Sequence, residues 1–157
     1  METAEMVLKK SVTVAGTPEV AFRVFTEGID SWWPRATHSV GEEKVAEVVF
    51  EPGVGGRLLE RHADGAEHVW GRVTEWEPPE RVAYTWYPGR GEDTAQTVVV
   101  TFRPDGDGTR VDIDQRGWEV LGERAEETVA SYDGDRGWTA VLALYVEAVE
   151  RARAPEA

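Results

Sequence analysis

Hydrophobic and polar positions alternate along most of the chain with the two-residue period of β-strands. The first such run covers residues 6–14 and is rich in β-branched side chains. Further runs follow one another with short separators that hold the glycine, proline or aspartate that turns require. These predicted strands cover residues 44–51, 57–62, 66–76, 81–87, 96–103 and 109–118. Because the connections are short, we expect an antiparallel meander.

Between the first strand and the meander, the apolar residues recur with the period of a helix. Thr17 can cap a short helix that begins at Pro18, and Gly28 ends it. Residues 29–33 fit a second short helix, which Pro34 helps to end. The opening of the chain therefore predicts a strand followed by two short helices.

The longest helical pattern lies near the C-terminus, in residues 134–153, after a charged interval at residues 119–127. Its apolar side chains share one stripe, formed by Trp138, Val141, Leu142, Tyr145 and Val149. At 1.5 Å per residue such a helix is long enough to cross a whole sheet.

The order of these elements predicts an α+β fold. We expect a curved antiparallel sheet of about seven strands around the long C-terminal helix, with the two short helices closing one end and an internal cavity between them. No repeat or second domain appears, so residues 1–157 are predicted to form a single domain with a frayed tail at 154–157.

Composition narrows the function classes. The 17 basic and 30 acidic residues give a net charge of −13, which disfavours nucleic acid and anionic membranes as partners. No run of 18 apolar residues and no signal segment is found, so we expect no membrane insertion and a cytoplasmic location. Cysteine is absent, which removes disulfides, thiolate metal sites and cysteine nucleophiles. The seven tryptophans are many for this length, and some must meet polar partners or a ligand.

Strand alternation predicts which side chains face the interior. A two-residue turn at residues 64–65 would place Glu60 and Gly71 on the inner face and His68 and Trp70 on the outer face. Gly71 would then let a helix approach the sheet closely. The same parity directs Gln115 inward.

Glu60 and Gln115 are thus polar residues on a mainly apolar inner face. A buried carboxylate must be paired, hydrogen-bonded or protonated. One interpretation is that Glu60 lies at a wet rim or accepts a hydrogen bond from a tryptophan N–H. The other is that Glu60 and Gln115 are the polar anchors of an apolar ligand pocket.

The sequence predicts no metal, cofactor or motif-based catalytic site. His62 and His68 fall on opposite faces of the predicted hairpin, so a shared metal site is not expected. No serine lies in a GxSxG turn, and no glycine-rich segment matches GxxxxGK[ST].

Trp32 and Trp33 are adjacent, and neighbouring positions on a helix point about 100° apart. We expect one indole to turn inward and roof the cavity while the other packs against neighbouring residues, and we assign the roof to Trp33. The alternative is that both only pack the end of a helix.

Several segments, in order along the chain, resemble one known family. They are "AFRVFTEGIDSWWPRATHSVG", "VVFEPGVGGRLLER", "DGAEHVWGRVTEWEPPERVAYTW", "VTFRPDGDGTRVDIDQRGWE" and "YDGDRGWTAVLALY". The chain is similar to bacterial homologues of heat-shock-protein (Hsp) ATPase activators, which belong to the START and birch-pollen-allergen, or SRPBCC, superfamily. The resemblance covers nearly the whole chain and implies the helix-grip fold, with a hydrophobic cavity between the long helix and the sheet.

The resemblance leaves function open, because the superfamily includes lipid carriers, hormone receptors, polyketide aromatase/cyclases and co-chaperone domains. Members of the family commonly carry a histidine where this chain has Gln115. Glutamine can hydrogen-bond a ligand, but it cannot move a proton near neutral pH. An acid–base role at this position is therefore in doubt.

Three functions are compared. The leading hypothesis is binding of a small apolar or aromatic molecule by Trp33, Glu60, Trp86, Gln115, Trp138, Leu142 and Tyr145. A second is a co-chaperone-like module that docks on a chaperone and changes its ATPase cycle. A third is an aromatase/cyclase-like enzyme, for which Glu60, Tyr84 and His38 are the acid–base choices. The sequence leaves open whether the protein is a monomer or a homodimer.

Overall fold

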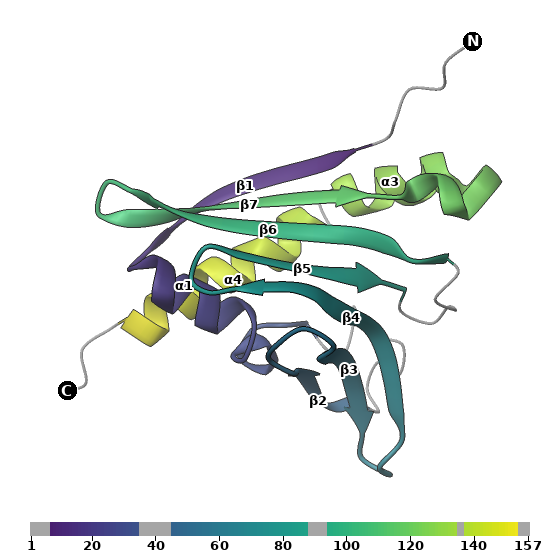
Figure 1. Ribbon diagram of the computed structural model, residues 1–157, viewed down its shortest axis with the longest axis horizontal. Helices are drawn as coiled ribbons and strands as arrows, with labels where there is room; N and C mark the ends of the chain where they lie inside the picture. The colour runs from purple at the N-terminus through teal and green to yellow at the C-terminus, as the bar shows by residue number, and fades with distance from the viewer. Residues whose placement is uncertain (1–6, 35–44, 88–93, 135–136, 154–157) are drawn as a thin grey trace.

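A seven-stranded antiparallel sheet forms the framework of the computed structural model, which describes residues 7–34, 45–87, 94–134 and 137–153 (Figure 1). The spatial order of the strands is β1-β7-β6-β5-β4-β3-β2, so β2 to β7 form a meander and β1 adds to the edge of β7. The predicted pairing is confirmed. The strands are β1 (Leu8–Ala15), β2 (Val45–Phe50), β3 (Arg57–His62), β4 (Glu67–Glu77), β5 (Arg81–Trp86), β6 (Gln96–Asp105) and β7 (Gly108–Arg116).

The two predicted short helices are α1 (Pro18–Phe25) and the 3-10 helix η1 (Ile29–Ser31), and the long helix is α4 (Trp138–Arg153). The Thr17 hydroxyl caps α1 by accepting a hydrogen bond from the N–H of Val20 at 3.3 Å, as predicted. The chain also forms the 3-10 helix η4 (Trp118–Arg124) and helix α3 (Ala125–Asp133), where the sequence showed only charge. Helix α3 fully buries a single residue, Ala125, so it carries no apolar stripe that would reveal it.

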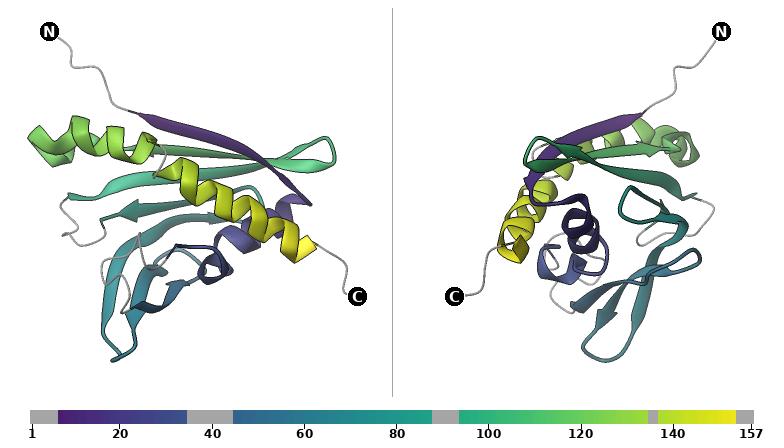
Figure 2. Two further views of the ribbon diagram at one scale, coloured as in Figure 1. Left: turned by 180° about the vertical axis from the view of Figure 1, so that it is seen from behind. Right: turned by 60° about the vertical axis from the view of Figure 1, so that its left-hand side comes forward.

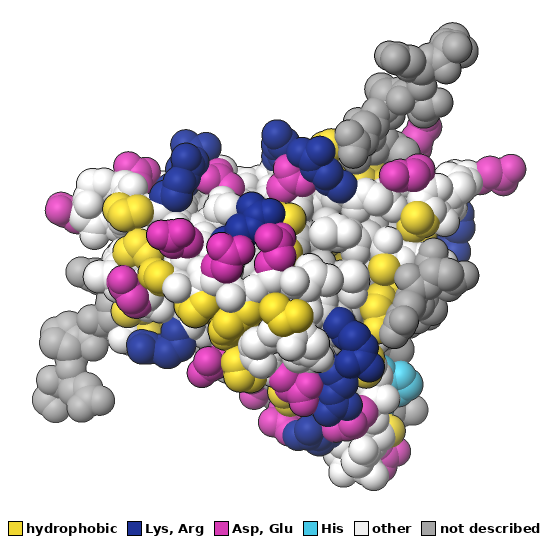
Figure 3. Space-filling view, viewed as in Figure 1, with side chains coloured by type: hydrophobic (Ala, Val, Ile, Leu, Met, Phe, Trp, Pro, Cys, Tyr) yellow, Lys and Arg dark blue, Asp and Glu magenta, His cyan; other side chains and the backbone are white. Residues whose placement is uncertain are grey.

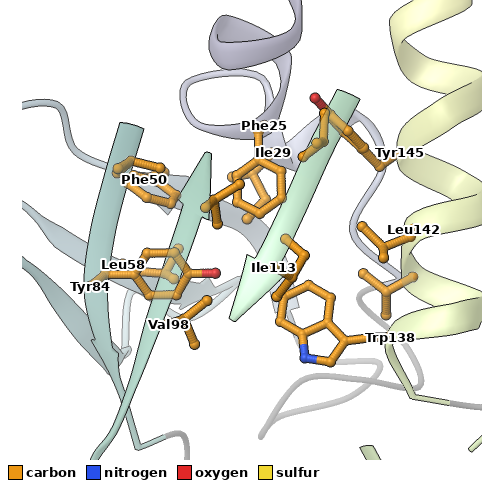
Figure 4. Close-up of a cluster of buried hydrophobic side chains, with 14 of the residues drawn as sticks. Phe25, Ile29, Phe50, Leu58, Tyr84, Val98, Ile113, Trp138, Leu142 and Tyr145 are labelled. Carbon is orange, nitrogen blue, oxygen red and sulfur yellow. The ribbon is translucent and has the colours of Figure 1, made fainter. Parts of the chain in front are cut away.

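Helix α4 crosses the inner face of the sheet (Figure 2). Its buried side chains are the predicted stripe together with Ala148. They pack with α1 and the inner-face strand residues into one hydrophobic core, part of which Figure 4 shows between Tyr84, Ile113 and Leu142. The α+β helix-grip architecture is therefore confirmed, and the short helices lie at one end of the sheet (Figure 1).

Two polar contacts hold the short helices in place. The Tyr145 hydroxyl on α4 donates to the carbonyl of Ala21 in α1 at 2.7 Å. The Asp30 carboxylate in η1 accepts a hydrogen bond from the Val48 N–H of β2 at 2.9 Å. These contacts fix the segment that carries Trp32 and Trp33 against both the long helix and the sheet. In the described part of the chain, no helix is long and apolar enough to cross a membrane.

The β3–β4 hairpin differs from its prediction. The N–H of His62 bonds to the carbonyl of Ala66 at 2.8 Å, so the turn has three residues where two were predicted. The register also shifts within the hairpin, because Leu59 pairs with Val69 while Leu58 pairs with Gly71. Trp70 is the extra residue of this β-bulge.

The bulge and the longer turn change the faces of β4. His68 pairs with Glu60, and the Trp70 side chain is fully buried on the inner face. The prediction that His68 and Trp70 lie on the outer face is therefore wrong. A one-residue change of register exchanges the two faces of a strand, and the alternating pattern cannot reveal where such a change occurs.

Gly71 allows a close approach between two strands, whereas the sequence analysis predicted a close approach of a helix to the sheet. A Cβ at this position would lie 1.7 Å from the carbonyl oxygen of Thr85 in the neighbouring strand β5. Beside it, the N–H of Tyr87 donates to the carbonyl of Trp70 at 2.6 Å. Gly71 thus lets β4 and β5 meet where the bulge turns Trp70 inward.

We expect Gly71→Ala to lower the free energy of unfolding by about 3 kcal/mol, because the added methyl group forces two strand backbones apart. Gly106→Ala is the control, since Gly106 has a φ of +58° but nothing within 4 Å of its added Cβ. That change should cost about 1 kcal/mol. Urea unfolding of both variants measures the difference, and equal losses would show that the close approach is unimportant.

Candidate functional site

Two fully buried polar side chains lie on the inner face of the sheet, Glu60 on β3 and Gln115 on β7. Both were predicted to point inward, and the structure confirms their burial. They lie in different surroundings, because Glu60 belongs to the β3–β4 side of the sheet and Gln115 faces the start of helix α4.

The Glu60 carboxylate is held by two neighbouring side chains. Its Oε1 accepts a hydrogen bond from Trp70 Nε1 at 2.7 Å, and its Oε2 lies 2.6 Å from His62 Nε2. The interpretation that Glu60 accepts a tryptophan N–H is confirmed. The His62 side chain is 10% exposed and that of Glu60 is 0% exposed, so the pair links the surface to the interior.

His62 and His68 do not lie on opposite faces. Their ring centroids are 4.6 Å apart at an interplanar angle of 32°. The three-residue turn explains the difference, because it moves His68 onto the side of Glu60 and His62. Within the described ranges, no group of three His, Cys, Asp or Glu side chains could hold a metal ion.

Three indole rings form a cluster beside Glu60. The ring centroid of Trp33 is 5.1 Å from that of Trp70 and 5.9 Å from that of Trp86. Trp70 and Trp86 are 5.6 Å apart. The Nε1 of Trp86 donates to the Tyr132 hydroxyl of α3 at 3.0 Å, which fixes the orientation of this ring. Trp70 is the member that the sequence analysis missed, because only the bulge turns it inward.

The adjacent tryptophans have separate surroundings. Trp32 is buried, donates from Nε1 to the Val24 carbonyl at 2.8 Å, and packs against Phe25 and Tyr145 with centroid distances of 5.5 and 5.2 Å. Trp33 stays partly exposed on the indole cluster. The two side chains therefore pack against different neighbours. The role of Trp33 as the roof of the cavity remains a prediction.

Gln115 faces the first turn of α4. Its Oε1 accepts a hydrogen bond from Trp138 Nε1 at 2.8 Å, and its backbone carbonyl accepts one from Trp118 Nε1 at 2.9 Å. The predicted site residues Gln115 and Trp138 are thus joined by a direct hydrogen bond. Trp118, which the sequence analysis did not select, supports the same residue from the following 3-10 helix.

Leu142 and Tyr145 are also buried in the core, on the face of α4 that packs against the sheet and α1 (Figure 4). The Tyr145 hydroxyl is already bonded to the Ala21 carbonyl, so this group joins two helices. These residues provide apolar surface and rigidity to the interior.

Tyr84 lies on the inner face between the two polar centres. Its ring is 6.2 Å from that of Trp86, and it pairs with Val98, which in turn pairs with Gln115. Burial raises the pKa of Tyr84 well above its ordinary value, because the ionised form would be poorly solvated. Its hydroxyl thus remains protonated and fits a donor better than a base. His38, the remaining acid–base choice, lies outside the described residues.

The outer face of the sheet has a different character. A hollow of about 640 Å³ there is lined by charged and polar side chains that include Arg81, Arg103 and Asp112. Basic and acidic groups are interspersed on this face (Figure 3), with ion pairs such as Arg103 to Asp112 at 3.1 Å. The indole cluster, Glu60 and Gln115 are on the inner face, so we place the candidate site there. The internal cavity itself remains a prediction.

Comparison with protein families gives one match. The family model described as Activator of Hsp90 ATPase homolog 1-like protein matches residues 15–150 of the chain. No match was found among curated proteins.

Solved structures extend the comparison. An anthrahydroquino-γ-pyrone synthase, Txn09, solved in complex with the ligand SUM, is 36% identical with a TM-score of 0.62, and the match covers 92% of this chain and 97% of that one. The self-sacrificing resistance protein CalC from Micromonospora echinospora is 26% identical, with a TM-score of 0.67 and coverage of 97% and 99%. The Aha1 dimer from Colwellia psychrerythraea, 14% identical with a TM-score of 0.65 and coverage of 95% and 99%, shares the fold.

The two adjacent tryptophans should differ in their effect on stability. We expect Trp32→Phe to lower the unfolding free energy by about 2 kcal/mol, because it removes the bond to the Val24 carbonyl and leaves a gap in the core. Trp33→Phe, a matched change at a partly exposed position, should cost less than about 1 kcal/mol. Denaturant unfolding followed by circular dichroism measures both, and similar losses would contradict the separate packing roles.

Proposed function

The chain belongs to the family of Activator of Hsp90 ATPase homolog 1-like proteins, and from this membership we propose that it binds a small hydrophobic or aromatic ligand between α4 and the inner face of the sheet. Its fold is a ligand-binding fold, shared with an anthrahydroquino-γ-pyrone synthase and a resistance protein. The class of ligand and the residues that contact it are what we propose beyond the fold.

The observation that carries the proposal is the indole cluster of Trp33, Trp70 and Trp86. Its rings lie within 6 Å of one another at angles between 48° and 70°, so they present both faces and edges. Such surfaces favour flat aromatic ligands, which gain from edge and face contacts in addition to burial. Trp33 is partly exposed, and in this proposal it forms the movable side of the entrance.

The remaining predicted site residues take complementary roles in the proposal. Glu60 and Gln115 are the polar anchors, and Trp138 orients Gln115 through the hydrogen bond described above. Leu142 and Tyr145 complete the apolar lining from α4. A site of this composition, mainly apolar with few placed polar groups, is typical of small-molecule pockets.

A panel of polycyclic aromatic compounds tests the proposal. We expect at least one class to quench tryptophan fluorescence and to raise the melting temperature. Trp33→Phe should weaken that binding about fivefold, because the smaller ring loses contact area and stacking. Trp32→Phe, the same chemical change one residue earlier, should leave the affinity within about twofold. A panel without any response, or equal losses in both variants, would refute this assignment.

A second candidate is an aromatase/cyclase-like reaction, favoured by the 36% identity to a γ-pyrone synthase. Among the described residues, Glu60 fits the acid–base role, because His62 connects it toward the surface at 2.6 Å. Tyr84 fits less well, since burial disfavours its ionised form. In this alternative the pocket positions a polyketide and Glu60 exchanges a proton with it.

Turnover of an uncyclised aromatic polyketide, followed by absorbance, tests this alternative. Glu60→Gln keeps an oxygen for Trp70 but removes the exchangeable proton, so it should slow product formation about 100-fold while substrate affinity changes little. Unchanged rates in the variant would exclude Glu60 as the acid–base group. The absence of product with the native chain would contradict this alternative.

A protein-interaction role remains the other alternative, supported by the family description and by the fold shared with an Aha1 dimer. In that case the partner is a chaperone ATPase, and the chain acts as a monomer or as a homodimer. The location proposed for each alternative is the cytoplasm.

A further inference from the structure

The amide nitrogen of Gln115 is buried without a hydrogen-bond partner in the described part of the chain. The side chain is fully buried, so surface water does not solvate its two N–H groups. Leaving such a donor unpaired costs about 1–3 kcal/mol, and native structures rarely retain one without a reason. The position of this group therefore calls for an acceptor.

The orientation of the amide is set by its neighbour. The Trp138 indole has one N–H and can only donate, so the atom 2.8 Å from it must be the Gln115 oxygen. Turning the amide over would place two donors against each other. The backbone oxygen of Gln115 is likewise taken by the Trp118 indole. Both oxygens of this residue are therefore used by tryptophans, and the amide N–H groups point elsewhere.

The neighbours of Gln115 across the sheet supply no acceptor. The register places Leu8, Gln115, Val98 and Tyr84 in one row on adjacent strands. Leu8 and Val98 are buried and apolar, and Tyr84 lies two strands away from Gln115. With strands about 4.8 Å apart, the row extends about 10 Å from Gln115 to Tyr84. Figure 4 shows the Tyr84 hydroxyl pointing toward the middle of the buried cluster.

The row has no cationic side chain, so it does not fit an anionic oxygen, which would need a charge partner when buried. It fits a neutral oxygen that accepts a hydrogen bond from the Gln115 amide. A carbonyl oxygen on a flat, apolar ring system has this chemistry. The Gln115 amide and the Tyr84 hydroxyl could meet such a group from the same face of the sheet.

We propose that the Gln115 amide donates a hydrogen bond to a ligand carbonyl, and that the ligand class is aromatic ketones and quinones. This inference rests on the proposed ligand-binding function and makes it more specific. It assigns Gln115 as the residue that distinguishes a carbonyl-bearing ring system from the corresponding hydrocarbon. Trp138 acts as a positioning residue, because it holds the amide with its donors toward the ligand.

Xanthone and xanthene test the proposal, since they share a tricyclic ring system and differ in having a carbonyl or a methylene at one position. We expect the native chain to bind xanthone about tenfold more tightly than xanthene, the effect of one satisfied buried donor. In Gln115→Met, which keeps the size but removes the amide, the two affinities should become equal. Xanthene affinity should change less than about twofold.

Gln96→Met is the matched control. Gln96 is also fully buried, but its Nε2 already donates to the Thr94 carbonyl at 2.9 Å. This variant should keep the tenfold preference for xanthone. A loss of preference in both variants would show a general effect of altering a buried glutamine and would overturn the assignment to Gln115.

A measurement on the native chain keeps the proposal testable if Gln115→Met does not fold. The infrared carbonyl band of bound xanthone should shift to lower wavenumber than in an apolar solvent, as expected for a hydrogen-bonded carbonyl. An unshifted band, or equal affinity of the native chain for both probes, would overturn the inference while leaving ligand binding intact. Failure of both probes to bind would refute the proposed function together with this inference.

Discussion

Each buried indole has one N–H group, and this donor must find an acceptor inside the protein. Most of the tryptophans meet this requirement in different ways. The acceptors are the Val24 carbonyl for Trp32, the Glu60 carboxylate for Trp70, the Tyr132 hydroxyl for Trp86, and the backbone and side-chain oxygens of Gln115 for Trp118 and Trp138. The bond of Trp32 links the end of η1 to α1, and the bonds of Trp86, Trp118 and Trp138 link α3, η4 and the start of α4 to the sheet. The tryptophan content is thus a system of specific connections as well as apolar volume.

The same requirement shapes the chemistry of the interior. The indoles use oxygen acceptors, so Glu60 is held by Trp70 and His62, and the acceptor atoms of Gln115 are occupied. The amide N–H groups of Gln115 remain as hydrogen-bond donors without a partner among the described residues. Glutamine does not titrate near neutral pH, so Gln115 is suited to hydrogen bonding and not to proton transfer. If the interior performs acid–base chemistry, the Glu60–His62 pair is better placed for it than Gln115.

Family membership and fold constrain function to different degrees. The Aha1 dimer shares the architecture at 14% identity, which speaks for the backbone arrangement alone. The γ-pyrone synthase is more similar in sequence, at 36% identity over nearly the whole chain. On this ground the proposed function places a small-molecule ligand before a chaperone partner. The distribution of side chains agrees with this order of proposals. The indole cluster lies on the inner face, whereas the outer face carries ion pairs.

The sequence by itself determined the strands, the long helix and the burial of Glu60 and Gln115, because two-residue and helical periods directly encode which side chains leave water. It did not reveal α3, whose exposed faces carry no apolar stripe. It also placed Trp70 and His68 on the wrong face, because the turn length and the bulge at Trp70 depend on contacts between strands. Only the tertiary structure decided which acceptor each indole found, and thus that Trp138 holds the Gln115 oxygen and leaves its amide donors unpaired within the described residues. Hydrogen bonds between residues distant in the sequence depend on three-dimensional position, which no local pattern records.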